Sequence, residues 1–157
     1  MTCVKWYATV EVACNCFALL MSDCLMLGNA FFARVLHADV LGLQRIAVIN
    51  NGWHMQRTRD VYTHVFAVPT RDPCAVKPFN LTFVQVASGL DSDVERLRLA
   101  KETATIPKFA PGGPWQRETP TLEALHLWLH RENLAYAAQR LMQTPSQPID
   151  HALAKSY

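Results

Sequence analysis

The stretch behind a short apolar run concentrates groups that can bind an anion. The residues that follow Ile46–Ile49 include Asn50, Asn51, Gly52, His54 and Arg57. Amide and imidazole groups donate hydrogen bonds, and the planar guanidinium pairs with both oxygens of a phosphate or carboxylate. A segment that only had to pack would not need so many donors. The composition of this stretch therefore predicts a ligand site.

The surrounding elements alternate between helices and strands. The pattern predicts a helix from Asn29 to about His37 or Asp39, strand Ile46–Ile49, a helix from about His54 to His64, strand Val65–Val68, strand Leu81–Ala87, a helix capped by Asp91 and closed by Pro107, and a long last helix capped by Thr119 that ends near Gln143. This order predicts an α/β fold, a Rossmann-like three-layer domain around a mostly parallel sheet. Ile46–Ile49 and Leu81–Val86 should then be neighbouring parallel strands.

In such sheets ligands bind outside the carboxyl ends of the strands. Backbone N–H groups from Gly52 to His54 would hold an anion, with Gly52 at positive φ, and Arg57 would project back to supply charge. His54 would orient the ligand or carry a proton, making it the candidate catalytic residue. The competing interpretations are that His54 only caps the helix and that Arg57 pairs with Asp60 or Asp93 on the surface.

Four segments together resemble the SanA/YdcF/ElyC-like family, a domain of poorly defined function. They are "GNAFFARVLHAD", "LGLQRIAVINNGWHMQRTRDVY", "SGLDSDVERLRLAKET" and "LEALHLWLHRENLAYAA". Asn29-Ala30 and His54-Met55-Gln56-Arg57-Thr58 match the family's Asn-Ala pair and its His-Met-Pro-Arg motif, with Gln56 in place of the proline. The resemblance covers roughly residues 22 to 142. Family members begin with glycine-rich turns that residues 1 to 28 do not contain.

The resemblance implies a ligand set of Asn29, Asn51, Gly52, His54 and Arg57. It also implies a nucleotide-like ligand, such as S-adenosylmethionine, without a defined reaction. We expect one YdcF-like α/β domain at residues 1–143, with a divergent or truncated start at 1–28 and a flexible tail at 144–157. Asn29 has the further interpretation of a plain helix N-cap.

Composition limits the remaining function classes. The formal net charge of +2 is too small to predict a nucleic-acid-binding surface. No apolar run reaches the roughly 18 residues of a membrane span, and no secretory signal is visible, which favours a cytoplasmic protein. The five cysteines have no metal-type spacing, so they are interpreted as reduced and mostly buried thiols.

Two other functions compete with anion binding. The domain could be a non-catalytic remnant that acts only through protein partners, and an open sheet edge would then drive self-association. It could also be a metal-dependent hydrolase, because His126 and His130 are four residues apart and share one helix face. No third ligand is evident and one histidine could simply flank the buried face, so the sequence favours no metal site.

Overall fold

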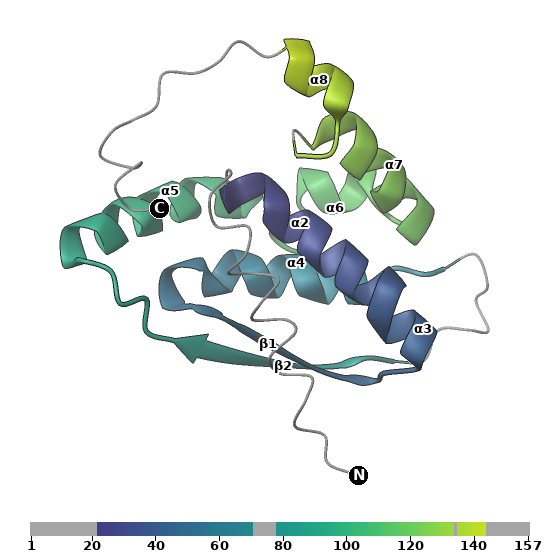
Figure 1. Ribbon diagram of the computed structural model, residues 1–157, viewed down its shortest axis with the longest axis horizontal. Coiled ribbons are helices and arrows are strands. Elements are labelled where there is room, and N and C mark those ends of the chain that lie inside the picture. Colours follow the sequence, from purple (N-terminus) through teal and green to yellow (C-terminus); the bar gives the residue numbers. More distant parts are fainter. Residues whose placement is uncertain (1–21, 71–77, 134, 144–157) are drawn as a thin grey trace.

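The computed structural model describes residues 22–70, 78–133 and 135–143, and its elements are labelled in Figure 1. The predicted tail at 144–157 and most of the predicted divergent start lie outside these residues. The elements are, in chain order, α2 (Ser22–Phe32), the π-helical η2 (Ala33–Ala38), α3 (Asp39–Leu41), β1 (Arg45–Asn51), the 3-10 turn η3 (Gly52–His54), α4 (Met55–Ala67), β2 (Asn80–Val86), α5 (Ser92–Phe109), α6 (Pro114–Glu118), α7 (Leu122–Glu132) and α8 (Ala138–Gln143).

The two strands pair in parallel, which confirms that they are neighbours in one sheet. Ile46 lies opposite Leu81 and Val48 lies opposite Phe83. Parallel strands need a long crossover, and α4 lies within the connection between them. The fold is therefore a mixed α/β arrangement with a small parallel sheet.

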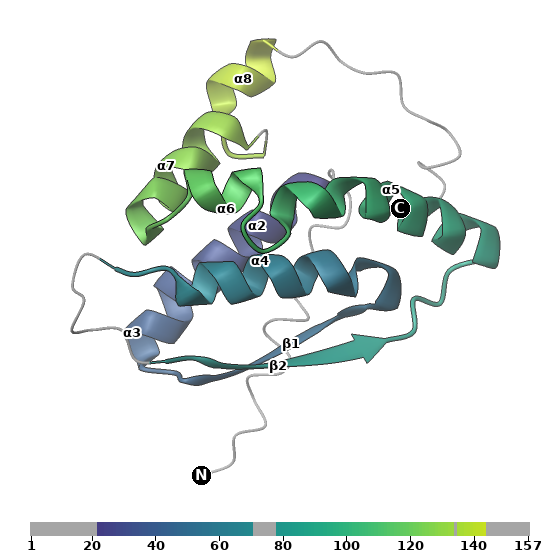
Figure 2. The same ribbon diagram turned by 180° about the vertical axis from the view of Figure 1, so that it is seen from behind.

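The described helices all lie on one side of this sheet, as both views show (Figures 1 and 2). Val48 is buried on the covered side, where Ile46 and Phe83 also pack against the core. Val84 and Val86 belong to the other set of alternating positions and are 42% and 43% exposed. Within the described residues, the sheet has two strands and one helix-covered face. The finer expectation of three layers is not established by this arrangement.

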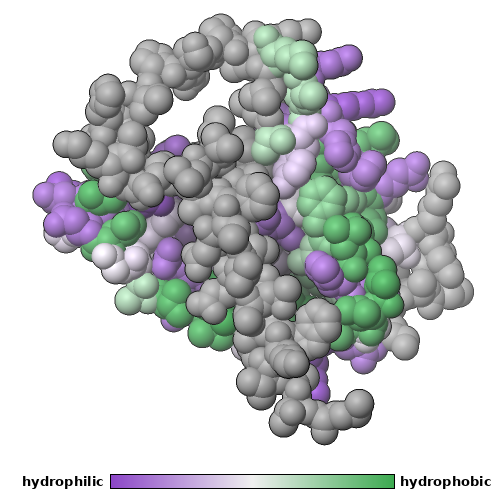
Figure 3. Space-filling view, in the orientation of Figure 1, coloured by the Kyte–Doolittle hydropathy of each residue, from purple (hydrophilic) through white to green (hydrophobic). Residues whose placement is uncertain are grey.

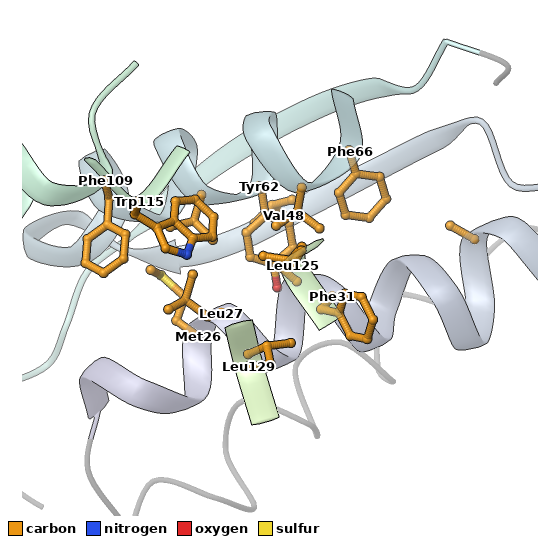
Figure 4. Close-up of a cluster of buried hydrophobic side chains, with 14 residues drawn as sticks. Met26, Leu27, Phe31, Val48, Tyr62, Phe66, Phe109, Trp115, Leu125 and Leu129 are labelled. Atoms are coloured by element: carbon orange, nitrogen blue, oxygen red, sulfur yellow. The ribbon is translucent and has the colours of Figure 1, made fainter. Parts of the chain in front are cut away.

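The core joins α2, α4 and α7 (Figure 4). Its buried side chains include Met26, Leu27, Phe31, Val48, Tyr62, Phe66, Phe109, Trp115, Leu125 and Leu129. Gly28 of α2 lets the ring of Tyr136 approach closely, because a Cβ at residue 28 would collide with the tyrosine hydroxyl. These contacts hold α7 and the residues after it against α2.

The predicted strand Val65–Val68 is wrong, because α4 continues to Ala67. Val61, Tyr62, Val65 and Phe66 are all buried. Val61 and Val65 are four residues apart, as are Tyr62 and Phe66, so the four share one helix face. Burial of that face outweighs the β-propensity of this short valine-containing stretch. Val68 then leaves the helix with extended backbone.

The predicted last helix is also wrong in its bounds. Thr121, rather than Thr119, caps α7 by accepting a hydrogen bond from the Ala124 N–H at 3.1 Å. Asn133 interrupts the helix, and its side chain accepts from the Ala135 N–H at 3.0 Å. The preceding loop contains α6, and Pro107 lies inside α5 instead of ending it. The first helix begins earlier than predicted, and η2 and α3 extend it to Leu41.

One side of this first helical stretch carries an apolar surface. Leu36, Val40 and Leu41 are 57%, 71% and 49% exposed, and Figure 3 shows hydrophobic residues gathered over this part of the molecule. An exposed cluster of large apolar side chains is typical of a contact surface. In the described part of the chain, no helix has the length and apolar character needed to cross a membrane.

His64 connects α4 to the residues that precede α7. Its Nε2 lies 2.9 Å from the carbonyl oxygen of Thr119 and 3.0 Å from that residue's hydroxyl. Burial lowers the pKa of His64, and the hydrogen bond to the Thr119 backbone opposes part of this effect. The lowered pKa favours the neutral ring at pH 7, with Nε2–H donating to the carbonyl oxygen of Thr119.

We expect the free energy of unfolding to fall as the pH is lowered below about 6.5. In that window the unfolded chain binds a proton at His64 that the folded protein does not, so stability rises with pH. One such proton contributes at most about 1.4 kcal/mol per pH unit. Urea titrations between about pH 5 and 8 should give a flatter dependence for His64→Gln, while the exposed control His37→Gln keeps the original slope. Equal slopes in all three proteins would contradict this assignment.

Candidate functional site

The carboxyl end of β1 leads directly into a helix, as predicted. β1 ends at Asn51, and η3 and α4 follow without a loop. The expected positive φ at Gly52 is wrong, because among the described glycines only Gly42, Gly89 and Gly112 have it. Gly52 instead accommodates Gln85 of the neighbouring strand, whose side-chain amide a Cβ at residue 52 would meet. Because that amide is the end of a flexible, exposed side chain, the constraint on Gly52 is modest.

Asn50 connects the strand to the helix rather than facing a ligand. Its Nδ2 donates to the Thr58 hydroxyl at 2.8 Å, and its Oδ1 accepts from the Asn51 N–H at 2.8 Å. The Thr58 hydroxyl lies 2.9 Å from the His54 carbonyl oxygen. This chain of hydrogen bonds fixes the angle at which α4 leaves the strand.

A buried cluster of three ionisable side chains lies at the start of α4. Arg57 donates through Nε and Nη2 to the two carboxylate oxygens of Glu102, each at 2.7 Å. His54 Nδ1 lies 2.9 Å from Glu102 Oε2. Arg57 and Glu102 are 1% and 3% exposed. The cluster therefore joins α4 to α5 by charge-assisted hydrogen bonds.

The carboxylate determines which nitrogen of His54 carries the proton. Nδ1 has two polar neighbours, a Glu102 carboxylate oxygen at 2.9 Å and the Arg57 Nη2 donor at 3.3 Å. The carboxylate is the nearer of the two, and a lone pair facing it would be repulsive, so we assign the hydrogen to Nδ1, which donates it to Glu102. Nε2 makes no hydrogen bond with the described residues. It is also not completely buried, because the fully buried polar atoms that lack a partner do not include it. His54 is 7% exposed. This is the arrangement of a histidine oriented by a carboxylate, with its other nitrogen not bonded to the described residues.

The contacts of Arg57 differ from both interpretations of the sequence. The sequence suggested either an anion clamp or a surface pair with Asp60 or Asp93, but the guanidinium is buried and bound to Glu102. Its carbon also lies 5.7 Å from the centroid of the Phe109 ring. A charge that is already paired in this way is not available to attract a ligand in the manner predicted.

Asp60 has a different partner. It is 7% exposed, and Gln56 Nε2 lies 3.2 Å and 3.3 Å from its two carboxylate oxygens. Burial raises the pKa of Asp60, while the Gln56 hydrogen bond and the charge of Arg59 oppose the shift. The residue that replaces the family's proline therefore stabilises a buried carboxylate.

Trp53 places an aromatic surface beside His54. The two ring centroids are 5.1 Å apart, and the guanidinium of Arg98 from α5 lies 4.9 Å from the Trp53 ring centroid. The indole Nε1 is buried and has no hydrogen-bond partner in the described part of the structure. Buried donors are nearly always paired, so this one is suited to an acceptor that a ligand would supply.

The remaining predicted residues are more dispersed. Asn29 lies inside α2, so it is not the N-cap of that helix, and no hydrogen bond joins it to His54 across the described residues. Asn51 is half-buried at the N-cap of η3 but makes no side-chain capping bond. The structure therefore brings Gly52, His54 and Arg57 together, and adds Asn51 by chain continuity.

His126 and His130 lie on α7, with ring centroids 4.6 Å apart. In the residues that the structure describes, no group of three or more potential metal ligands is found. His126 also borders a shallow hollow of ≈ 400 Å³ between α2 and α7, whose lining includes Phe31, Val35 and Leu122. This hollow is not at the strand ends.

The sequence did not single out Glu102. It lies on α5 within "LAKETAT", and Asp93 and Glu95 on the same helix are equally acidic. The sequence signal for this carboxylate was Arg57, because an arginine in the first turn of a buried helix needs a carboxylate partner. Which carboxylate that is depends on how α5 packs.

Comparisons with known proteins found no matching family model, no matching curated protein and no matching solved structure.

We expect Glu102→Ala to lower the free energy of unfolding by about 3–5 kcal/mol, because it leaves the buried Arg57 charge without a partner. The matched control is Arg96→Ala, which removes a surface pair with Asp93 whose side chains are 78% and 77% exposed. That control should cost less than about 1 kcal/mol. Urea denaturation measures both.

A double variant separates the charge from the packing. Arg57→Met with Glu102→Leu replaces the pair with apolar groups, and it should recover most of the stability that Glu102→Ala loses. If Glu102→Ala costs no more than Arg96→Ala, the buried pair does not stabilise the fold.

Proposed function

We propose that the carboxyl end of β1 binds a small anionic, phosphate-bearing molecule, with His54 as the group that contacts it. The observation that carries the proposal is the 2.9 Å contact between His54 Nδ1 and Glu102 Oε2. This contact orients the imidazole and leaves Nε2 for the ligand. A histidine held in this way can accept a proton from a ligand or, when protonated, donate one.

The local charges support an anion. Arg57 and Glu102 balance each other, so the remaining positive potential comes from the N-terminal end of η3 and α4. The backbone N–H groups at a helix N-terminus also favour negative groups. Trp53 adds a buried donor and an aromatic face, which suits a ligand that joins an anionic group to a planar ring.

We further propose that the chain is a member of the family that its sequence resembles. The four segments that resemble the SanA/YdcF/ElyC-like family imply a nucleotide-like ligand, and S-adenosylmethionine is one candidate. The aromatic face of Trp53 beside His54 is compatible with a nucleobase. The reaction, if any, would use His54 as the acid or base.

A partner-binding role is the second candidate, and the exposed sheet favours it. Within the described residues the sheet has only two strands, so each has an unpaired edge, and Val84 and Val86 are exposed beside them. Such edges pair readily with another strand. The partner would be a second copy of the chain, joined along β2.

Binding of inorganic phosphate and adenosine nucleotides, followed by isothermal titration calorimetry, tests the first candidate. We expect His54→Gln to weaken binding by on the order of tenfold or more, since it removes a hydrogen bond to a charged ligand. Trp53→Phe should weaken it less, because a smaller aromatic ring remains while the indole N–H donor is lost.

His37→Gln is the control, because His37 is exposed on η2. Circular dichroism must show that His54→Gln is folded, since glutamine can still donate to Glu102. Unchanged affinity in a folded His54→Gln protein would overturn the assignment of His54.

Sedimentation over a dilution series tests the second candidate. We expect a dimer that dissociates on dilution, and Val84→Lys should shift it to monomer because a charge on an edge strand opposes pairing. Thr63→Lys, an exposed change on α4, should leave the association unaltered. A monomer at all concentrations would count against this role.

A further inference from the structure

The exposed face of α7 presents two histidines as neighbours. His126 and His130 are both exposed and lie one helical turn apart. Their ring centroids are 4.6 Å apart, with the rings tilted by 56°. Residues four apart on a helix project side by side, so the two imidazoles reach the same volume of solvent.

Aromatic contacts support the orientation of both rings. His126 lies against Phe31 of α2 with 5.6 Å between centroids, and Phe31 is 4% exposed and therefore fixed in the core. The His130 ring centroid lies 6.4 Å from that of Tyr136. Ligands held in this way lose less side-chain freedom when they bind an ion.

We propose that His126 and His130 form a binding site for a divalent transition-metal ion such as Zn²⁺, Ni²⁺ or Cu²⁺. Neutral imidazole nitrogen coordinates these ions at about 2.0–2.1 Å, and two rings this close can bind one ion together. Mg²⁺ and Ca²⁺ prefer oxygen ligands and are excluded by the same donors.

The ion would keep open coordination positions. No third histidine, cysteine or carboxylate completes the group among the described residues. Water or an anionic group of a bound molecule would therefore fill the rest of the coordination sphere. The hollow beside His126, lined in part by Phe31 and Leu122, gives such a molecule an apolar surface to contact. The site lies on α7 and is independent of His54.

Isothermal titration calorimetry with Ni²⁺ and Zn²⁺ tests the site directly. We expect His126→Gln and His130→Gln each to weaken binding by on the order of tenfold or more, because either change leaves a single ligand. His37→Gln, an exposed histidine on η2, should bind the ions like the wild type. The cysteines are common to all four proteins, so they do not account for a difference among them.

Thermal unfolding supplies a second readout. Ni²⁺ should raise the melting temperature of the wild type and of His37→Gln, EDTA should reverse the rise, and the two α7 variants should lack it. Mg²⁺ should have no effect in any protein. If the α7 variants bind Ni²⁺ as tightly as the His37→Gln control, or if the shift persists in both, the assignment is overturned.

Discussion

The buried interaction of Glu102 with Arg57 and His54 is the constraint on which the arrangement of helices depends. Only two residues of α5, Glu102 and Phe109, are buried, although the helix is 18 residues long. Apolar burial alone therefore holds α5 weakly. Two hydrogen bonds of 2.7 Å between Glu102 and Arg57 link its middle to α4. A carboxylate buried without them would be strongly unfavourable, so α5 has one position in which its charge is satisfied.

A second buried guanidinium acts at the opposite end of α4. Arg34 donates through Nη1 to the carbonyl oxygens of Val65 and Val68, at 2.5 Å and 2.7 Å. These carbonyls are at the helix C-terminus, where a cation is favourable. Asp39 lies 3.4 Å from Arg34 Nε and partly compensates the burial that lowers the Arg34 pKa. α4 is thus held near its start by α5 and at its end by η2, which fixes the helix that connects the two strands.

The sequence predicted the parts of the fold that local patterns determine. Both strands, their parallel pairing and the Asp91 cap of α5 follow from β-branched runs and capping residues. The errors arose where tertiary contacts decide. Val65 to Val68 has the apolar pattern of a short strand, but Val65 and Phe66 are buried on one face of α4. Thr119 loses the capping role to Thr121 because it is buried and bonded to His64. At the site, local sequence identified His54 and Arg57, but Glu102 is 45 residues from Arg57 and only packing selects it.

The pairing of Arg57 changes how the strand end could select a ligand. A free guanidinium would attract any anion through a fixed charge, whereas the Arg57–Glu102 pair contributes little net charge. Under the proposed function, selection would then depend on directional groups, namely the Nε2 of His54, the indole N–H of Trp53 and the backbone N–H groups at the helix start. Directional donors discriminate by position and shape more than by charge. The buried pair therefore has two consequences from one geometry. It fixes α5 against α4, and under the proposed function it would make recognition at the strand end depend on the orientation of a single imidazole.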